Sequence, residues 1–389
     1  MIRMRCLAFF PAVCFPMAAS LATAQNVDVW FGTTTPKGGE SRGIYHSSLD
    51  TNTGKLTRPT LATQCDQPGF LALHPDGKTL YATGRPAAAD GPRDAVSAFR
   101  VNGSAGRSEL EFIGAVGTGD GGAAQVSTDR AGKVLLSAQY GGGSTSLYQL
   151  DQDGRIARLA EVKKHADLMP NVGSGVVEGR QTASHAHWTG TSPDDRFAFV
   201  PDLGMDRVVI WKLDADKPSL THHGYGICPP GSGPRHMKFS VDGSKIYVLN
   251  ELSLTITVFD YNAQDGEMTP VQTIATLSEE VKAKETFNSA SEIRVHPSGR
   301  FVYSANRGHD SISVFRVDDT GTLEAVEVEA IRGGWPRNFN IDPTGKWLIA
   351  AGRDSNTATL FSIDAESGEL TFMRETQPVP TPICVLFGQ

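Results

Sequence analysis

The segment HPDGKTLYATGR, at residues 74–85, decides how this chain is expected to fold, because related segments return five more times. The copies are DRAGKVLLSAQY at 129–140, SPDDRFAFVPDL at 192–203, SVDGSKIYVLNE at 240–251, HPSGRFVYSANR at 296–307 and DPTGKWLIAAGR at 342–353. Each copy joins a tetrad of turn-forming residues to an apolar strand. Copies that recur every 46 to 63 residues are typical of a propeller or another repeat array.

A second short strand precedes every tetrad. These strands begin near residues 67, 122, 184, 233, 290 and 335, and a seventh, TPICVLF at 381–387, has no tetrad after it. Its missing partner is VWFGTT at 29–34, which reads like the strand that follows a tetrad. A blade split between the two termini closes a ring and removes exposed sheet edges. We therefore predict an all-β fold, a seven-bladed β-propeller with one blade closed by N- and C-terminal strands.

The composition agrees with many short strands joined by turns. The 389 residues include 41 glycines and 22 prolines, and only 20% of the residues are charged. The net charge of −7 provides no basic surface for nucleic acid or for an anionic membrane. We therefore predict no nucleic-acid partner and no stable membrane insertion, whereas the oligomeric state stays open.

The N-terminus has the order of a secretory signal. Arg3 and Arg5 precede an apolar run over residues 6–19, and the small residues ATA at 22–24 stand at the cleavage spacing. Two prolines interrupt the run, which is also too short for a membrane anchor. We predict a signal peptide at 1–24, a propeller domain at 25–389, and a periplasmic or secreted protein.

Two segments break the repeat. Residues 151–183 form a long polar connection, which is either a lid over one face or a surface insertion. Residues 276–285, TLSEEVKAKE, contain a T-x-x-E capping box, so we predict one short helix there. The cysteines beyond the predicted signal, Cys65, Cys228 and Cys384, fit neither a disulfide framework nor a zinc pattern.

The geometry of the hairpins predicts where reactive side chains collect. The first strand of each blade surrounds the axis, and its start lies beside the end of the second strand, on the face opposite the tetrads. Aligning the copies brings arginines, histidines and two glutamates to this opening. The predicted catalytic residues are His185, His187, Arg235, Glu251 and Arg307, and the predicted substrate-binding residues are His236, Asn250, Glu292, Asn306, Arg337, Asn338 and Arg353.

Such an opening suits an anion, because guanidinium groups bind carboxylate or phosphate bidentately. His185 and His187 stand two apart on a strand, so both point the same way and either could be a general base. Glu251 or Glu292 could be the second acid/base group, and an arginine could stabilise a developing oxyanion.

Several of these residues also have structural interpretations. His185 could bond a carbonyl at a strand end, Glu251 could pair with Arg235, and Arg353 could link neighbouring blades. The tetrad histidines lie on the opposite face, where we predict a structural role. His-Ala-His is too sparse to define a metal site, and no serine elbow, glycine-rich phosphate loop or H-E-x-x-H motif is present. We therefore predict no metal and no cofactor.

Four segments together resemble the lactonase family of seven-bladed propellers, and the resemblance covers essentially the whole predicted mature chain. They are QTASHAHW at 181–188, GPRHMKF at 233–239, SANRGHDSISVF at 304–315 and WPRNFNIDPTGKW at 335–347. The family includes propeller-type 6-phosphogluconolactonases and carboxy-cis,cis-muconate lactonising enzymes. In the cyclase branch the resemblance implies a catalytic histidine, two arginines and a glutamate, which fall on His185 or His187, Arg235, Arg307 and Glu251.

The function predicted from the sequence is an exported, 6-phosphogluconolactonase-like lactone hydrolase that opens a small anionic lactone or related carboxylate of the sugar-acid type. A carboxymuconate cyclase-type isomerase is the alternative within the same family. A non-catalytic propeller that binds an anionic ligand or a protein partner is the alternative from a different class.

Overall fold

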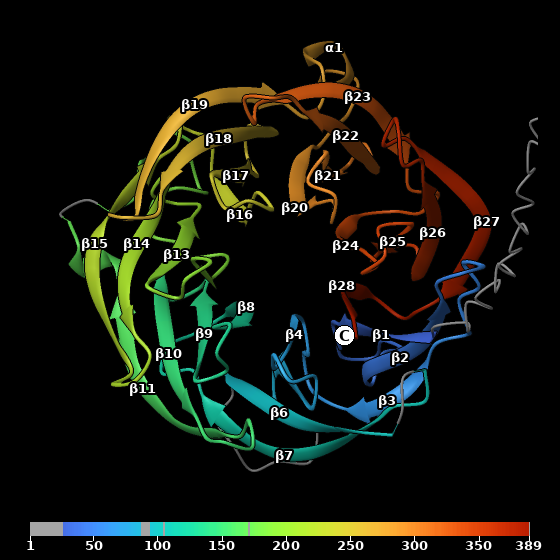
Figure 1. Cartoon of the computed structure of the whole chain (residues 1–389), viewed down its shortest axis with the longest axis horizontal. Helices are drawn as coiled ribbons and strands as arrows, with labels where there is room; N and C mark the ends of the chain where they lie inside the picture. The colour runs from blue at the N-terminus through green and yellow to red at the C-terminus, as the bar shows by residue number, and fades with distance from the viewer. Residues whose placement is uncertain (1–25, 87–93, 104–105, 170–171, 389) are drawn as a thin grey trace, which may run out of the picture.

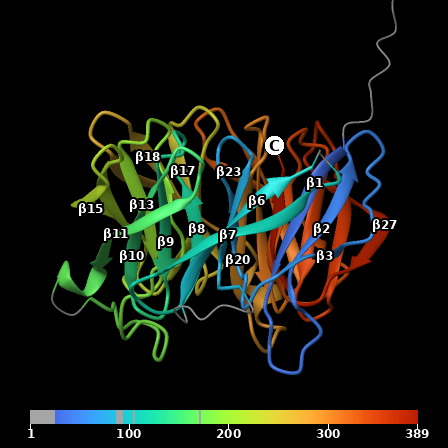
Figure 2. The same cartoon turned by 90° about the horizontal axis from the view of Figure 1, so that it is seen from below.

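The computed structural model describes residues 26–86, 94–103, 106–169 and 172–388. Within them, four-stranded antiparallel sheets form seven blades around a central axis (Figure 1). The side view in Figure 2 shows the blades packed into one thick disc. The predicted seven-bladed β-propeller is confirmed. The predicted signal peptide at 1–24 lies outside the described residues.

Each blade runs from an innermost strand to an outermost one. In blades 1 to 4 the strands are β28 (Pro382–Phe387), β1 (Asn26–Thr33), β2 (Gly43–Asp50), β3 (Thr60–Gln64); β4 (Leu71–Leu73), β5 (Thr79–Thr83), β6 (Ala95–Asn102), β7 (Glu109–Gly117); β8 (Ala123–Thr128), β9 (Val134–Gln139), β10 (Ser144–Leu150), β11 (Ile156–Lys164); and β12 (Gly190–Thr191), β13 (Phe197–Asp202), β14 (Arg207–Asp214), β15 (Ser219–Ile227). In blades 5 to 7 they are β16 (Pro234–Phe239), β17 (Lys245–Asn250), β18 (Thr255–Asn262), β19 (Glu267–Ala275); β20 (Ser289–Val295), β21 (Phe301–Arg307), β22 (Ser311–Val317), β23 (Leu323–Ala330); and β24 (Pro336–Ile341), β25 (Trp347–Gly352), β26 (Thr357–Ile363), β27 (Leu370–Pro378).

Blade 1 joins the two ends of the described chain. Strand β28 pairs antiparallel with β1, with Val29 opposite Phe387 and Phe31 opposite Val385. Figure 1 shows the two strands side by side, the first in blue and the last in red. The predicted split blade is therefore confirmed, and it closes the ring without a free inner edge.

The core lies between the blades. Each hydrophobic cluster joins two neighbours, as where Val29 and Phe31 of β1 pack with Ile349 and Leu360 of blade 7. Second strands such as β9, β13 and β25 are buried along their whole length, whereas outermost strands such as β19 consist mostly of exposed or half-buried residues. This burial explains the uninterrupted apolar runs after each tetrad.

Tetrad histidines link two pairs of neighbouring blades on one face of the disc. Gly345 has a positive φ of 75°, which favours glycine, and its carbonyl lies 2.7 Å from Nε2 of His296 in the preceding blade. His74 makes the same contact with the carbonyl of Gly132 at 3.2 Å. The tetrad histidines therefore have the structural role that the sequence indicates.

The segments outside the repeat differ in part from expectation. Strand β11 and a 3-10 turn, η1 (His165–Asp167), occupy the first part of the 151–183 connection. The predicted short helix is present as α1 (Glu279–Lys282), but the capping box is wrong. Ser278 is the N-cap and accepts a hydrogen bond from the Val281 amide, whereas the Thr276 hydroxyl donates to the carbonyl of Leu254.

Two further features concern the chain as far as the structure describes it. No helix among those residues is long and apolar enough to cross a membrane. Cys65, Cys228 and Cys384 are buried free thiols.

Candidate active site

Two adjoining cavities open the propeller on the face opposite the tetrads. The larger, of about 440 Å³, is lined by Tyr140, Arg180, His187, Glu251, Phe287, Arg307, Arg337 and the small residues at 122–124. The smaller, of about 150 Å³, is more enclosed, and its lining includes Phe70, His187, Arg235, His236 and Arg337. We call them the outer and inner chambers. His187 and Arg337 border both chambers, so they stand at the junction.

Glu251, at the end of β17, gathers three arginines. Its Oε1 accepts a 2.6 Å hydrogen bond from Nη2 of Arg180. Its Oε2 lies 2.8 Å from Nε of Arg235 and 3.0 Å from Nη2 of Arg307. Burial alone would raise the pKa of Glu251, but Arg307 and Arg235 lower it to about 2. The carboxylate is therefore ionised at neutral pH, and the geometry favours its orienting role over the acid/base role.

The two arginines paired with Glu251 are fixed by further contacts. Arg235 donates through Nη1 to Nε2 of His236 at 3.0 Å and to the carbonyl of Ser291. Arg307 donates through Nη2 to the carbonyl of Ala290 at 2.8 Å. Burial, reinforced by Arg307, lowers the pKa of Arg235 to about 9, which still leaves it charged at neutral pH. Both guanidinium groups are thus held in place before any ligand binds.

Arg337 differs from the other arginines of the cavity. It has no hydrogen bond or ion pair within the described part of the chain, although it borders both chambers. Burial and the charge of Arg307 lower its pKa to about 10, so it too remains a cation at neutral pH. Arg337 is only partly buried in β24, and a partly enclosed cation without a partner attracts a ligand of opposite charge. Arg337 is therefore the group best placed to bind an anion or a developing oxyanion.

The structure distinguishes the two predicted histidines. His187 is buried at the junction of the chambers, and its Nδ1 is enclosed without a hydrogen-bond partner. Burial and the nearby Arg235 hold the pKa of His187 well below its ordinary value, so the imidazole is neutral at neutral pH. His185 is stacked on Tyr140, with ring centroids 4.6 Å apart, and its Nδ1 lies 2.9 Å from the Tyr140 carbonyl. His187 is thus the better candidate for the general base, and His185 adopts the alternative structural contact.

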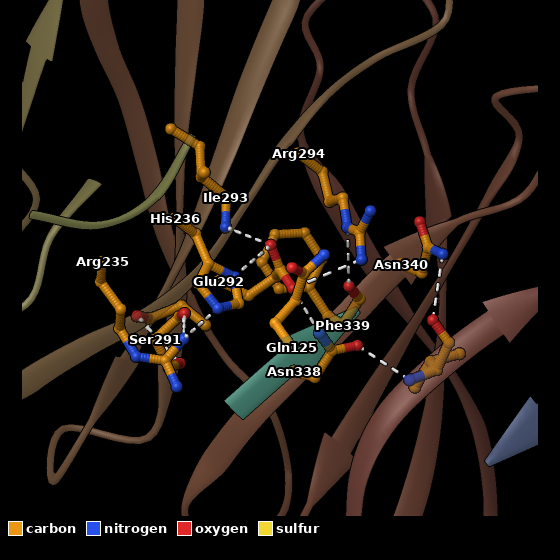
Figure 3. Close-up of polar contacts among 12 residues, drawn as sticks. Gln125, Arg235, His236, Ser291, Glu292, Ile293, Arg294, Asn338, Phe339 and Asn340 are labelled. Atoms are coloured by element: carbon orange, nitrogen blue, oxygen red, sulfur yellow. Dashed lines mark hydrogen bonds and ion pairs between the residues drawn. The ribbon is translucent and has the colours of Figure 1, made fainter. Parts of the chain in front are cut away.

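A buried polar network connects two lining residues of the inner chamber, Arg235 and His236, with Glu292 and Asn338 (Figure 3). Because the guanidinium of Arg235 can only donate, Nε2 of His236 accepts, and Nδ1 carries the proton that it shares with Oε1 of Glu292 at 3.1 Å. Burial lowers the pKa of His236 to about 3, so the ring is neutral. Burial alone would raise the pKa of Glu292, but Arg294 and His236 hold it below its ordinary value. Asn338 donates to Glu292 and accepts from the Val385 amide.

This network changes the roles predicted for three residues. His236 borders the inner chamber, but Glu292 and Asn338 are fully buried beneath it and bond to protein groups. Glu292 and Asn338 therefore form the floor of the inner chamber. Asn338 bonds Glu292, Glu292 orients His236, and His236 in turn orients Arg235. Direct contact with substrate, as the sequence predicts for Glu292 and Asn338, does not agree with this burial.

Three other predicted substrate-binding residues are not brought into the chambers. Asn250 donates to the hydroxyls of Thr255 and Thr257, and Asn306 makes the equivalent bonds to Ser311 and Ser313. Successive residues of a strand point to opposite faces, so these amides point into their own blades while Glu251 and Arg307 point to the cavity. Arg353 pairs with the adjacent Asp354 at 2.6 Å rather than with another blade, and its guanidinium lies 4.9 Å from the Trp335 ring centre.

Arg180 and Phe287 line the outer chamber but are absent from the sequence prediction. Arg180 comes from the 151–183 connection between blades 3 and 4, and Phe287 lies just after the 276–285 segment, between α1 and β20. Gln181 anchors the first segment by donating to the Leu203 carbonyl and the Asp206 carboxylate. The length and polarity of residues 151–183 were the available signal, and part of that connection does border the opening.

The site as a whole is cationic. Four guanidinium groups, those of Arg180, Arg235, Arg307 and Arg337, surround the single carboxylate of Glu251 in the lining of the two chambers. No group of three or more His, Cys, Asp or Glu side chains is arranged to hold a metal ion in the described ranges. A neutral imidazole beside unpaired cationic charge can activate water and stabilise negative charge on an ester carbonyl.

The fold and this cavity define a β-propeller with an enzyme-like site on its axis. A model of the family described as lactonase, 7-bladed beta-propeller, matches residues 28–387. The chain belongs to this family, and it is an enzyme of the lactonase class. The resemblance noted from the sequence is confirmed.

Similar proteins extend over nearly the whole chain. A 6-phosphogluconolactonase from Bacillus subtilis is 35% identical over 360 residues, which cover 92% of this chain and 97% of that protein. A 6-phosphogluconolactonase from Formosa agariphila is 31% identical, with 84% and 90% covered. The solved structure of a periplasmic gluconolactonase from Pseudomonas aeruginosa aligns with a TM-score of 0.83 at 27% identity, covering 94% of this chain and 99% of that one.

Proposed function

We propose that this protein is an exported hydrolase that opens a small anionic lactone of the sugar-acid type, without a cofactor. The observation that carries the proposal is the junction of the chambers, where the side chain of His187 and the unpaired guanidinium of Arg337 line the same space. The names of the relatives, 6-phosphogluconolactonase and gluconolactonase, support the reaction class.

In the proposed reaction His187 accepts a proton from water, and the resulting hydroxide adds to the lactone carbonyl carbon. The carbonyl oxygen becomes an oxyanion, which Arg337 stabilises by direct charge-assisted hydrogen bonds. The ring C–O bond then breaks, and the protonated His187 returns its proton to the departing alcohol oxygen. The product is an open hydroxy acid, whose carboxyl proton passes to solvent, so His187 is regenerated neutral.

The preference for an anionic substrate rests on charge. Only one carboxylate faces the four guanidinium groups of the two chambers, and it is already shared by three of them. Arg337 is therefore available for a phosphate or carboxylate substituent, and Arg307, which also lines the outer chamber, adds positive charge there. Such charge in a concave site also raises the local concentration of anions.

The proposal of export rests on the order of residues at the N-terminus, where two arginines, an apolar run and ATA at 22–24 follow one another. The periplasmic relative of known structure agrees with that location. N-terminal sequencing of the protein recovered from a periplasmic or culture fraction should begin at Gln25. Recovery of the intact N-terminus from the cytosol alone would contradict export.

The deciding experiment is a panel of lactones assayed at fixed pH by acid release. Phosphorylated and carboxylated sugar lactones should be opened faster than glucono-1,5-lactone, and Arg337→Ala should lower kcat/KM most for the anionic members. Arg316→Ala, which removes an exposed arginine of β22, is the matched control and should change nothing. If the wild type accelerates no lactone above buffer but binds the anions, the protein is a binding module. If the protein instead closes carboxymuconate to a lactone, it is a carboxymuconate cyclase-type isomerase.

A further inference from the structure

The outer chamber is larger than the reaction needs. The proposed chemistry takes place at the junction of the chambers, where His187 and Arg337 lie, and the inner chamber offers about 150 Å³ beneath it. The outer chamber adds about 440 Å³ on the solvent side. A cavity of that size is in the range that buries a ligand well beyond a single small ring. The lining of the outer chamber shows what such a ligand would contact.

One wall of the outer chamber is an exposed aromatic ring. Phe287 is 45% exposed and stacks on Trp335, with ring centroids 5.3 Å apart and an interplanar angle of 19°. One face of Phe287 is therefore covered by Trp335, and the ring still presents substantial surface to the chamber that it lines. An aromatic face held in this way is suited to stack on a flat, partly apolar ring.

The base of that wall is rigid and strained. Trp335 adopts a positive φ of 60°, which is unusual for a bulky residue, and its amide donates to Asp310 at 2.9 Å. The guanidinium groups of Arg353 and Arg307 lie 4.9 and 5.6 Å from the centre of its ring. Backbone strain of this kind persists where the surroundings enforce it, and it concentrates at ligand sites. Trp335, itself held by these contacts, therefore supports one face of the Phe287 ring.

The remaining walls combine small residues with polar groups. Gly122, Ala123 and Ala124 provide a surface without bulky side chains, while Tyr140 and Arg180 provide donors. An aromatic face, open space and several hydrogen-bonding groups together match a pyranose ring, which has apolar C–H faces and a rim of hydroxyls. A plain alkyl chain would form no hydrogen bond with the Tyr140 hydroxyl or with the N–H groups of Arg180 that do not bond Glu251.

We propose that the outer chamber is a glycosyl subsite, so that the protein acts on lactones of disaccharide acids, with the lactone ring at the junction and the second sugar stacked on Phe287. This inference rests on the proposed lactone hydrolysis for its turnover assay. Binding of the sugar ring is tested separately.

The first experiment compares two lactones that differ only in the second sugar, glucono-1,5-lactone and lactobiono-1,5-lactone. The wild type should show at least a tenfold higher kcat/KM for the disaccharide lactone, mainly through KM. Phe287→Leu, which keeps apolar volume without an aromatic face, should remove that advantage, whereas Phe287→Tyr should retain it. Phe112→Ala is the matched control, because Phe112 is 44% exposed on the outer strand β7, far along the chain from the site, and should leave the ratio unchanged.

Binding of the open acids separates the two hypotheses. Lactobionate should bind at least tenfold more tightly than gluconate by calorimetry, and Phe287→Leu should abolish the difference while thermal unfolding stays cooperative. Turnover of glucono-1,5-lactone with no preference for either disaccharide ligand would overturn the glycosyl subsite and leave the proposed function intact. Preference for lactobionate without any lactone turnover would overturn the hydrolase and retain the subsite. Faster opening of a γ-lactone with a six-carbon alkyl tail than of the disaccharide lactone would also overturn the subsite.

Discussion

The carboxylate of Glu251 and the guanidinium of Arg235 form a hydrogen-bonded ion pair, with 2.8 Å between Oε2 and Nε, in which both side chains are almost inaccessible to solvent. Neither charge has enough water around it to be stable alone, so each depends on the other. Arg307 shares the same oxygen at 3.0 Å, so that one carboxylate fixes two arginines of the cavity. The orientation of the cationic groups therefore depends on a residue that is not itself suited to move protons.

Replacing Glu251 tests this dependence. Glu251→Gln should lower the free energy of unfolding by about 3 kcal/mol, because it leaves buried guanidinium charge uncompensated. It should also lower kcat/KM by about 100-fold, because Arg235 and Arg307 lose their fixed positions. Denaturant unfolding and steady-state kinetics on the best lactone measure the two effects. Glu279→Gln, in an exposed pair on α1, is the control and should leave both quantities unchanged. Wild-type stability and wild-type kinetics in Glu251→Gln would contradict the orienting role of this carboxylate.

The two histidines of the His-Ala-His segment should differ in their effect on the reaction. His187→Gln should lower kcat by about 1,000-fold, because it removes the group proposed to accept the proton of water. His185→Gln should lower kcat by less than about 10-fold, because it removes a ring that stacks on Tyr140 rather than a base. Single-turnover rates on one lactone compare them directly. Equal losses in the two variants would count against His187 as the base.

The stability of the protein should fall on acidification because His236 is buried as a neutral ring. Its pKa is about 3 in the folded state against an ordinary 6.5, so between these values the unfolded chain binds a proton that the folded chain does not. The free energy of unfolding should therefore decrease as pH falls from 6.5, by about 1.4 kcal/mol per pH unit for this group. Above pH 7 the group contributes no pH dependence, because both states are neutral.

The variant His236→Asn isolates this contribution. Its unfolding free energy, measured by denaturant titration at several pH values, should depend less steeply on pH between 6.5 and 4.5 than that of the wild type. The two slopes should coincide above pH 7, which serves as the internal control. Identical slopes below 6.5 would mean that the folded protein protonates His236 at its ordinary pKa.

The tetrad face should contribute to stability without affecting catalysis. His296→Ala removes a buried imidazole that lies 2.7 Å from the Gly345 carbonyl, so the free energy of unfolding should fall by about 2 kcal/mol. The kinetic constants should remain those of the wild type, because the contact lies on the opposite face from the chambers. Thermal unfolding and lactone kinetics on the same preparation check both expectations. A large fall in kcat with unchanged stability would show that the two faces are coupled.

The repeat made the fold and much of the cavity predictable. Each tetrad marks one blade, and the alignment of blades brings residues from distant positions, such as His187, Arg235 and Arg337, to one opening. The alignment identifies these residues because the same position in successive blades lies at the same place relative to the propeller axis. The same reasoning failed for Asn250 and Asn306, since an alignment by strand end ignores the alternation of side chains between the two faces of a strand.

Other features lie outside what a repeat can specify. Arg180 and Phe287 belong to connections that have no counterpart in the other blades, so an alignment of the repeats does not include them. Glu292 does occupy one of the aligned positions that the sequence places at the opening, but its contacts with His236, Arg294 and Asn338 remove it from solvent. The choice between His185 and His187 likewise depends on three-dimensional contacts, because the sequence gives both the same direction.

The pairing of β1 with β28 has a consequence for how the chain acquires its shape. Synthesis proceeds from the N-terminus, so β1 emerges long before β28, the strand that must cover its inner edge. Until residues 382–387 leave the ribosome, blade 1 lacks its innermost strand. The blades then form an open arc rather than a closed ring. The last strand completes both blade 1 and the ring, and its Ile383 belongs to the lining of the inner chamber, so the cavity has its full lining only when β28 is in place.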